Sequence, residues 1–272
     1  MSRIWCQLVS SPQKVPQMFS ALQEIADRLK CPDTTVDIRG TKVGGFADKY
    51  DAFLHLDGAE LLRLAMTDFQ DEPGDVYALV NSLDPAINGL REILDVPVLT
   101  LMEVACPMSL LWGDQFGLMV PNSKMVPQYH DVVARYHLGQ RMVGVEPLPF
   151  PHLLDLHRLY TGDKTLADHV MTALAEAAET LVHQGAEVLM SPGPVGHWLA
   201  GEGVTELAGA RFIDMFGLLL KVSEGVAVMA AQGALGPSRI RRYASPPVGL
   251  LKEAFKEYNL GAADSPKAPV NS

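Results

Sequence analysis

Short apolar runs alternate with longer segments of helical period along most of the chain. Each apolar run has the length of a buried strand and ends in a turn rich in Ser, Asn, Gly or Pro. Strands that alternate with helices form βα units, which build a parallel sheet covered by helices on both faces. The pattern therefore predicts a doubly wound, Rossmann-like α/β fold. The strands are expected at 4–9, 34–39, 76–80, 98–102, 116–120, 142–145, 187–190 and 210–213, and the main helices at 16–29, 58–69, 104–112, 125–136, 164–183 and 216–232.

The 272 residues carry a formal net charge of −10. An acidic chain disfavours nucleic acid and anionic membranes as partners, because both attract basic proteins. The N-terminus has no signal-peptide core, and no apolar stretch reaches the ~20 residues that cross a bilayer. The three cysteines have neither disulfide nor zinc-ligand spacing. We therefore expect a cytoplasmic protein without a metal site.

Four polar turns follow predicted strands, at the edge of an α/β sheet where ligands bind. They are Ser10-Ser11, Asn81-Ser82, Asn122-Ser123 and Ser191-Pro192-Gly193. Each opens a helix and can offer backbone N–H groups to an anion, although Ser and Asn also cap helices for purely structural reasons. The chain has no GxGxxG after its first strand, no phosphate loop, and no HExxH or GxSxG motif. No cofactor is therefore predicted.

The order of several segments resembles the aspartate/glutamate/hydantoin racemase superfamily. These segments are 3–7, 81–85 with 90–91, 96–98 with 103–105, 116–123, 185–188 with 191–193, and 243–247. The resemblance runs from about residue 3 to 247 and rests on the order of the pieces. It implies two similar flavodoxin-like lobes with parallel sheets, an active-site cleft between them, and a homo-oligomer.

The implied division of the chain gives one lobe from residues 1–103 plus 210–250 and the other from 104–209. The segment 259–272 is rich in Ala, Pro, Asp and Ser. That composition predicts a disordered tail.

Racemases of this family use two cysteines on opposite faces of the substrate's α-carbon. One thiolate removes the proton while the other thiol delivers one. The resemblance places these positions at Asn81, or Ser82, and at Pro192, or Gly193. Asparagine and proline cannot transfer protons in this way, so a two-cysteine mechanism is not expected.

Three residues remain as acid–base candidates: Glu103, Cys106 and His197. Each also has a structural interpretation. Glu103 can complement a helix N-terminus, and Cys106 can pack in the core. Cys6, in the first strand, and Cys31, just past a helix, are expected to be structural. His197 titrates near neutral pH but can also be a packing residue. The other seven histidines show no metal-ligand pattern and are interpreted as surface or core residues.

The candidate binding residues are those of the four polar turns, with two additions from the resembling segments. Gln7 ends the opening segment, and Tyr243 can reach the cleft if the C-terminal segment folds back over it. We expect an enzyme that acts on a small carboxylate or cyclic amide through a carbanion or enediolate-like intermediate, stabilised by backbone and Ser/Asn donors.

The resemblance implies racemisation or isomerisation. The absent cysteines leave a lyase, decarboxylase or hydrolase on the same scaffold as an alternative, and a non-catalytic small-molecule binder as another. Whether Glu103, Cys106 or His197 reaches the cleft distinguishes an enzyme from a binder.

Overall fold

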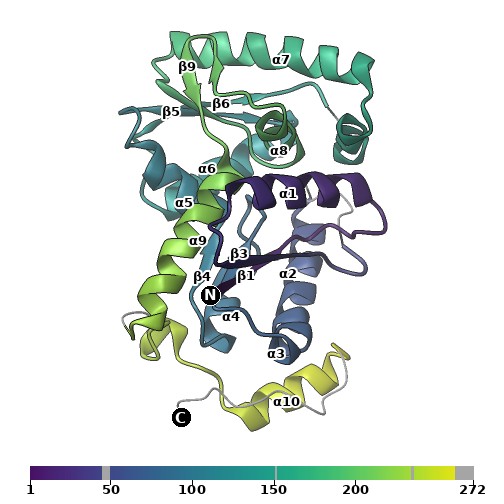
Figure 1. The fold of residues 1–272 in the computed structure, drawn as a ribbon, viewed down its shortest axis with the longest axis vertical. Helices are drawn as coiled ribbons and strands as arrows, with labels where there is room; N and C mark the ends of the chain where they lie inside the picture. Colours follow the sequence, from purple (N-terminus) through teal and green to yellow (C-terminus); the bar gives the residue numbers. More distant parts are fainter. Residues whose placement is uncertain (45–49, 151, 234–235, 261–272) are drawn as a thin grey trace.

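Two α/β lobes stack along the long axis of the molecule in a computed structural model that describes residues 1–44, 50–150, 152–233 and 236–260 (Figure 1). The first sheet has the order β2-β1-β3-β4, and all its strands are parallel. Its strands are β1 (Ser2–Gln7), β2 (Thr34–Arg39), β3 (Val76–Leu79) and β4 (Val98–Thr100). The predicted α/β class with parallel sheets is confirmed.

The second sheet has the order β6-β5-β7-β9-β8 and is parallel except for the antiparallel pair of β8 and β9. Its strands are β5 (Phe116–Val120), β6 (Met142–Pro147), β7 (Val188–Met190), β8 (Glu206–Leu207) and β9 (Ala210–Phe212). The helices of this lobe are η1 (Ser123–Met125), α6 (Val126–Arg135), η2 (Leu153–Thr161), α7 (Lys164–His183) and α8 (Pro194–Gly201).

The helices around the first sheet include one that comes from far along the chain. They are α1 (Pro16–Leu29), α2 (Asp51–Met66), α3 (Asp68–Asp71), α4 (Ile87–Ile93), α5 (Leu101–Ser109) and α9 (Met215–Ala231). Two C-terminal elements follow, η3 (Arg241–Tyr243) and α10 (Val248–Glu257). Helix α9 descends from the second lobe and lies along the first one (Figure 1).

Side chains of the first sheet alternate between two cores because successive residues of a strand point to opposite faces. Ile4 and Cys6 of β1 belong to the larger core, whereas Trp5 packs in the smaller one with Phe69 and Tyr77. The larger core continues without a break into the second lobe. Helix α1 bridges the lobes, because it also contacts α8 and η2.

The structure divides the chain differently from the sequence-based expectation of 1–103 plus 210–250 and 104–209. Strand β9 pairs with β7 in the second sheet, and α5 packs against β4 and α9 of the first lobe. A short apolar run has the same sequence pattern in either sheet, so the sequence does not indicate with which strand it pairs. The predicted strand 98–102 is likewise too long, because Thr100 ends it: its Oγ1 accepts a hydrogen bond from the Glu103 amide and caps α5. The predicted disordered tail lies outside the described residues from residue 261 on.

Candidate functional site

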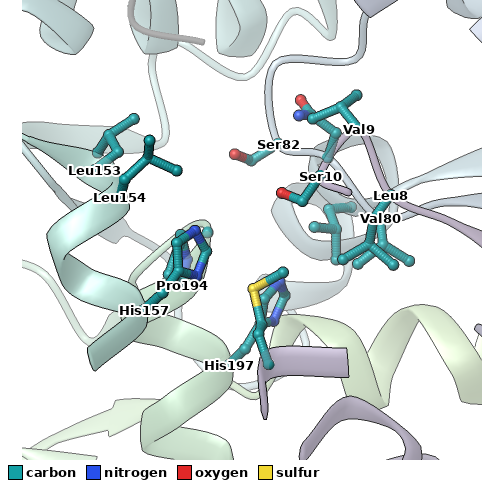
Figure 2. A pocket seen from close by; sticks show the side chains of 14 residues that line it. Leu8, Val9, Ser10, Val80, Ser82, Leu153, Leu154, His157, Pro194 and His197 are labelled. Atoms are coloured by element: carbon teal, nitrogen blue, oxygen red, sulfur yellow. The ribbon is translucent and has the colours of Figure 1, made fainter. Parts of the chain in front are cut away.

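A small cavity lies between the two lobes (Figure 2). Its volume is about 60 Å³. The first lobe contributes the carboxyl ends of β1 and β3 with α1 and α5, and the second lobe contributes η2 and the start of α8. Its walls are formed by Leu8, Val9, Ser10, Met18, Val80, Asn81, Ser82, Leu101, Leu153, Leu154, His157, Gly193, Pro194 and His197. The position agrees with the binding edge of an open α/β sheet.

Three of the four polar turns meet at this cavity. Ser10, Asn81 with Ser82, and Gly193 each come from a different turn. The fourth turn does not contribute to the walls. There the amide of Asn122 donates to the carbonyl of Phe150 (3.4 Å), and Ser123 is exposed.

The wall from the first lobe carries uncharged hydrogen-bonding groups. The side-chain oxygen of Asn81 accepts a hydrogen bond from the amide of Leu83 (2.8 Å), which orients the carboxamide. The Ser82 hydroxyl is hydrogen-bonded to the Tyr129 hydroxyl (2.8 Å), and both side chains are buried. Figure 2 shows the hydroxyls of Ser10 and Ser82 pointing across the cavity toward the side formed by η2. This wall can donate hydrogen bonds to a ligand oxygen.

The wall from the second lobe carries two histidines. His197 on α8 is 5% exposed and packs edge-on against Phe216, with ring centroids 5.9 Å apart. His157 on η2 is half-buried, and its Nδ1 has no hydrogen-bond partner among the described residues. The pKa of each imidazole is lowered to about 4, by burial in both cases and, for His197, also by the proximity of His157. Both are therefore neutral at physiological pH and able to accept a proton.

Two glycines allow α8 to begin at the cavity. Gly193 has φ 82° and ψ −154°, a region that is essentially restricted to glycine. A Cβ on Gly196 would lie 1.7 Å from the carbonyl oxygen of Ser191, so only glycine permits this close approach. The Tyr160 hydroxyl donates to the carbonyl of Pro194 (2.6 Å) and ties η2 to α8. The partly positive N-terminus of α8 thus borders the cavity.

Glu103 and Tyr243 lie together with Arg91, and neither lines the cavity. Arg91 forms an ion pair with Glu103 and donates to the Tyr243 hydroxyl (3.4 Å). Its guanidinium also lies 5.6 Å from the centre of the Tyr243 ring. The structure therefore places both residues in a cluster beside α5 that joins η3 to the first lobe.

None of the three cysteines lines the cavity. Cys6 and Cys106 are fully buried, and burial raises the pKa of the Cys6 thiol to about 12 and that of the Cys106 thiol well above its usual range. Cys31 is exposed, and its thiol contacts Glu224 (3.3 Å) on α9. Cys106, a predicted acid–base candidate, therefore lies in the core and does not reach the cavity.

The remaining predicted binding residues lie behind the cavity walls. Buried Gln7 donates to the carbonyl of Leu8 (2.8 Å) and accepts from the Trp5 indole (3.0 Å). Ser191 donates to the carbonyl of Met119 (3.1 Å). Ser11 donates to Gln13 (2.7 Å), and Pro192 is buried beside Gly193. These contacts hold the turns in place.

The cavity walls carry no Asp, Glu, Lys or Arg among the described residues. Within the same ranges, no group of three or more His, Cys, Asp and Glu side chains could hold a metal ion. In the described part of the chain no helix is long and apolar enough to span a membrane. The site is thus an uncharged pocket whose titratable groups are imidazoles.

The sequence left His157 out of the candidate site. It lies on η2, a 3-10 segment, about 40 residues before His197 in the sequence. The signal in the sequence is the three-residue spacing of Leu153, Leu156 and Leu159, which marks the buried face of η2.

The family model described as Asp/Glu/Hydantoin racemase matches residues 46–190. No curated protein matches the chain. Among solved structures, the chain is similar to allantoin racemase from Klebsiella pneumoniae, with a TM-score of 0.77, 16% identity and coverage of 90% of this chain and 94% of that one. Allantoin racemase from Pseudomonas fluorescens gives a TM-score of 0.76 and 21% identity, with 90% and 97% coverage. A glutamate racemase isoform from Bacillus anthracis gives 0.58 and 11%, with 95% and 94% coverage. At these identities the likeness shows the two-lobe fold.

Proposed function

Because the chain belongs to the Asp/Glu/hydantoin racemase family, we propose that it is an enzyme that moves a proton at a carbon next to a carbonyl group. The observation that carries the proposal is the pair of neutral imidazoles, half-buried His157 and buried His197, on the wall opposite the hydrogen-bonding groups of Ser10, Asn81 and Ser82. An acid–base group and oxyanion donors on opposite walls are the two requirements of such a reaction.

The uncharged walls favour a cyclic amide over a carboxylate as substrate. A carboxylate in a pocket without Arg or Lys would lose its hydration without gaining an ion pair. A hydantoin-like ring is neutral and carries carbonyl and N–H groups that match Ser and Asn side chains. Allantoin racemases among the similar structures, and hydantoin in the description of the family, support this class.

The proposed step places the base on the second lobe. An imidazole nitrogen of His197 takes the proton from the ring carbon, and the C–H electron pair moves toward the adjacent carbonyl. Negative charge then develops on the carbonyl oxygen, where the donors of Asn81 and Ser82 stabilise it. The imidazolium returns the proton to the same face. A proton from the opposite face would have to come from a serine hydroxyl, which is a poor acid.

The cavity must widen to admit such a ring, because its volume of about 60 Å³ is far below the ~300–1,000 Å³ of ordinary ligand pockets. The side chain of Leu154 on η2 is the part of the wall best placed to move. Leu154 on η2 is 45% exposed, so displacing it costs little apolar burial. We therefore propose that the Leu154 side chain moves aside to admit the substrate, while buried Leu156 and Leu159 hold the rest of η2 in place.

Hydrogen exchange in D2O tests this function. Each enantiomer of a set of 5-substituted hydantoins and of α-substituted carboxylates is incubated with the protein, with proton NMR following loss of the α-hydrogen and chiral chromatography following configuration. We expect exchange on the hydantoins above the enzyme-free rate, faster than inversion. His197→Gln should abolish it, and exposed His152→Gln, one step before η2, should leave it unchanged.

Other outcomes separate the alternatives. Exchange confined to the carboxylates would overturn the substrate class. Inversion as fast as exchange would overturn the proposal that the proton returns to the face from which it was removed. Release of a fragment or ring opening would identify a lyase, decarboxylase or hydrolase, and thermal stabilisation by hydantoins without any turnover would identify a binder.

A further inference from the structure

A second and larger cavity lies against the first lobe, away from the two histidines. Its volume is about 570 Å³, within the range of ordinary small-molecule sites. It is open to solvent and is lined by α2, the segment 83–89, Arg135 at the end of α6 and Arg242 on η3. None of its wall residues is shared with the interlobe cavity. Both cavities nevertheless border the same turn, because Asn81 and Ser82 face one while Asp84 and Pro85 face the other.

Asp84 supplies a buried carboxyl to this second cavity. It is 2% exposed, and its Oδ2 accepts a hydrogen bond from the Tyr136 hydroxyl (2.6 Å). Its Oδ1 has no hydrogen-bond partner within the described ranges. A buried carboxyl oxygen without a donor is costly, so a ligand that brings an N–H or ammonium group to it would relieve that cost.

Two arginines supply the opposite charge. The side chains of Arg135 and Arg242 are exposed and come from different lobes of the fold. Neither forms an ion pair in the part of the chain that the structure describes, in contrast to Arg91, which is engaged with Glu103. Two guanidinium groups at one cavity can bind a carboxylate or a phosphate through charge-assisted hydrogen bonds.

We infer that this cavity is a second ligand site that takes a small zwitterion of the amino-acid class, with its ammonium group at Asp84 and its carboxylate at Arg135 and Arg242. A simple anion would satisfy the arginines but leave Asp84 without a donor. A simple amine would face Asp84 together with two guanidinium groups. The site stands independently of the reaction proposed for the interlobe cavity.

Helix α2 provides a variant that closes the cavity. A Cβ on Gly58 would meet the Cβ of Ala86 at 3.5 Å, an ordinary contact, so a longer side chain there extends into the space. Leucine is also a better helix former than glycine. Gly58→Leu should therefore fill the cavity while keeping α2 intact.

Calorimetric titration of the full chain tests the site, with glycine, 4-aminobutyrate and 6-aminohexanoate as zwitterions of increasing length. Butyrate and butylamine are the single-charge controls. We expect at least one zwitterion to bind more tightly than both controls. Arg135→Gln and Arg242→Gln should each weaken it about tenfold or more, the usual effect of losing a hydrogen bond to a charged group. Asp84→Asn should remove the preference over butyrate, and Gly58→Leu should abolish binding.

His197→Gln should leave this binding unchanged, which separates the site from the interlobe cavity. The inference is overturned if no zwitterion binds, if butyrate binds as tightly as 4-aminobutyrate, or if the exposed arginine variants bind normally. Because both arginines are exposed, their variants fold and carry the test even if Asp84→Asn does not.

Discussion

The two lobes have similar architectures but bring different chemistry to the cavity between them. The first lobe presents Ser10, Asn81 and Ser82, which can hold an oxygen but are poor proton carriers at neutral pH. The second lobe presents His157 and His197, which can carry a proton. A family mechanism with one thiol on each lobe is symmetric about the substrate. Here the same scaffold carries an asymmetric site, so similarity of fold does not fix the division of labour between lobes.

The lobes also differ in whether the titratable groups that they bury are acids or bases. Near the cavity the second lobe buries bases, whereas the first lobe buries an acid, Asp84. Burial raises the pKa of Asp84 to about 7, and the hydrogen bond from Tyr136 opposes the shift. The two lobes should therefore respond to pH in opposite directions.

The largest expected effect is on catalysis. The contrast between the lobes would be wrong if substitutions in the first lobe, and not in the second, removed proton transfer. We predict that His197→Gln lowers the rate of α-hydrogen exchange by roughly 10²–10⁴-fold, the usual contribution of a general acid–base group. Thermal stabilisation by the same hydantoin should persist, since the donors of the first lobe remain. If Ser82→Ala stopped exchange while His157→Gln and His197→Gln both left it intact, the base would lie on the first lobe. Proton NMR in D2O measures the rates.

The acid of the first lobe should make stability fall as pH rises. An aspartate with a pKa of 3.8 in the unfolded chain and about 7 in the folded one holds its proton more tightly when folded. Unfolding free energy should thus decrease from about pH 4, levelling off above about pH 7, by about 4 kcal/mol in all.

Asp84→Asn should remove that part of the pH dependence. Urea denaturation of both proteins at several pH values measures it. A constant difference in stability between the two proteins from pH 4 to 8 would contradict the prediction. Asp155→Asn, at an exposed position on η2, is the control.

The bases of the second lobe should act in the opposite direction. A histidine with a pKa of 6.5 when unfolded and about 4 when folded contributes its full stability above pH 6.5 and loses it as pH falls through about 4. For His157 this amounts to roughly 3 kcal/mol. His157→Gln should therefore lose less unfolding free energy than the wild type between pH 6.5 and 4. The exposed variant His152→Gln should show the same dependence of unfolding free energy on pH as the wild type. Parallel curves for wild type and His157→Gln would show that His157 is not held neutral by burial.

The smallest expected effect concerns the turn that positions α8. Gly193→Ala places a Cβ in a backbone region that is nearly exclusive to glycine, at a cost of about 1–3 kcal/mol. Gly201→Ala at the other end of α8 meets no atom within 4 Å and should be neutral or slightly stabilising. Thermal unfolding of the two variants compares them. An unchanged melting temperature for Gly193→Ala would mean that α8 can begin with another backbone geometry.

Much of the fold was accessible from the sequence because local signals were strong. The helices predicted at 16–29 and 164–183 have those bounds in the structure: Pro16 starts the first, and Asp163 caps the second through the amide of Leu166 (3.0 Å). Assignment of β9 to a sheet depended on pairing with β7, which leaves no trace in a three-residue strand.

The candidate site was accessible only in part for a similar reason. Turns at strand ends converge by the topology of the sheet, so Ser10, Asn81, Ser82 and Gly193 could be anticipated. Glu103 satisfied the same rule, yet an arginine twelve residues earlier in the chain engages it. The leucine spacing of η2 indicates which face is buried, but the position of His157 at the cavity also depends on the packing of η2 against α8, which is not local in sequence.

The path of α9 has a consequence for synthesis on the ribosome. All four strands of the first sheet have been made by Thr100, but the helix that covers β1, β3 and β4 begins only at Met215, after the whole second sheet. At about 5–20 residues per second, the first lobe waits on the order of ten seconds with an apolar face uncovered. A chain cut between the lobes would keep that face exposed. The two lobes should therefore fold as one cooperative unit, with the second lobe completed before the first.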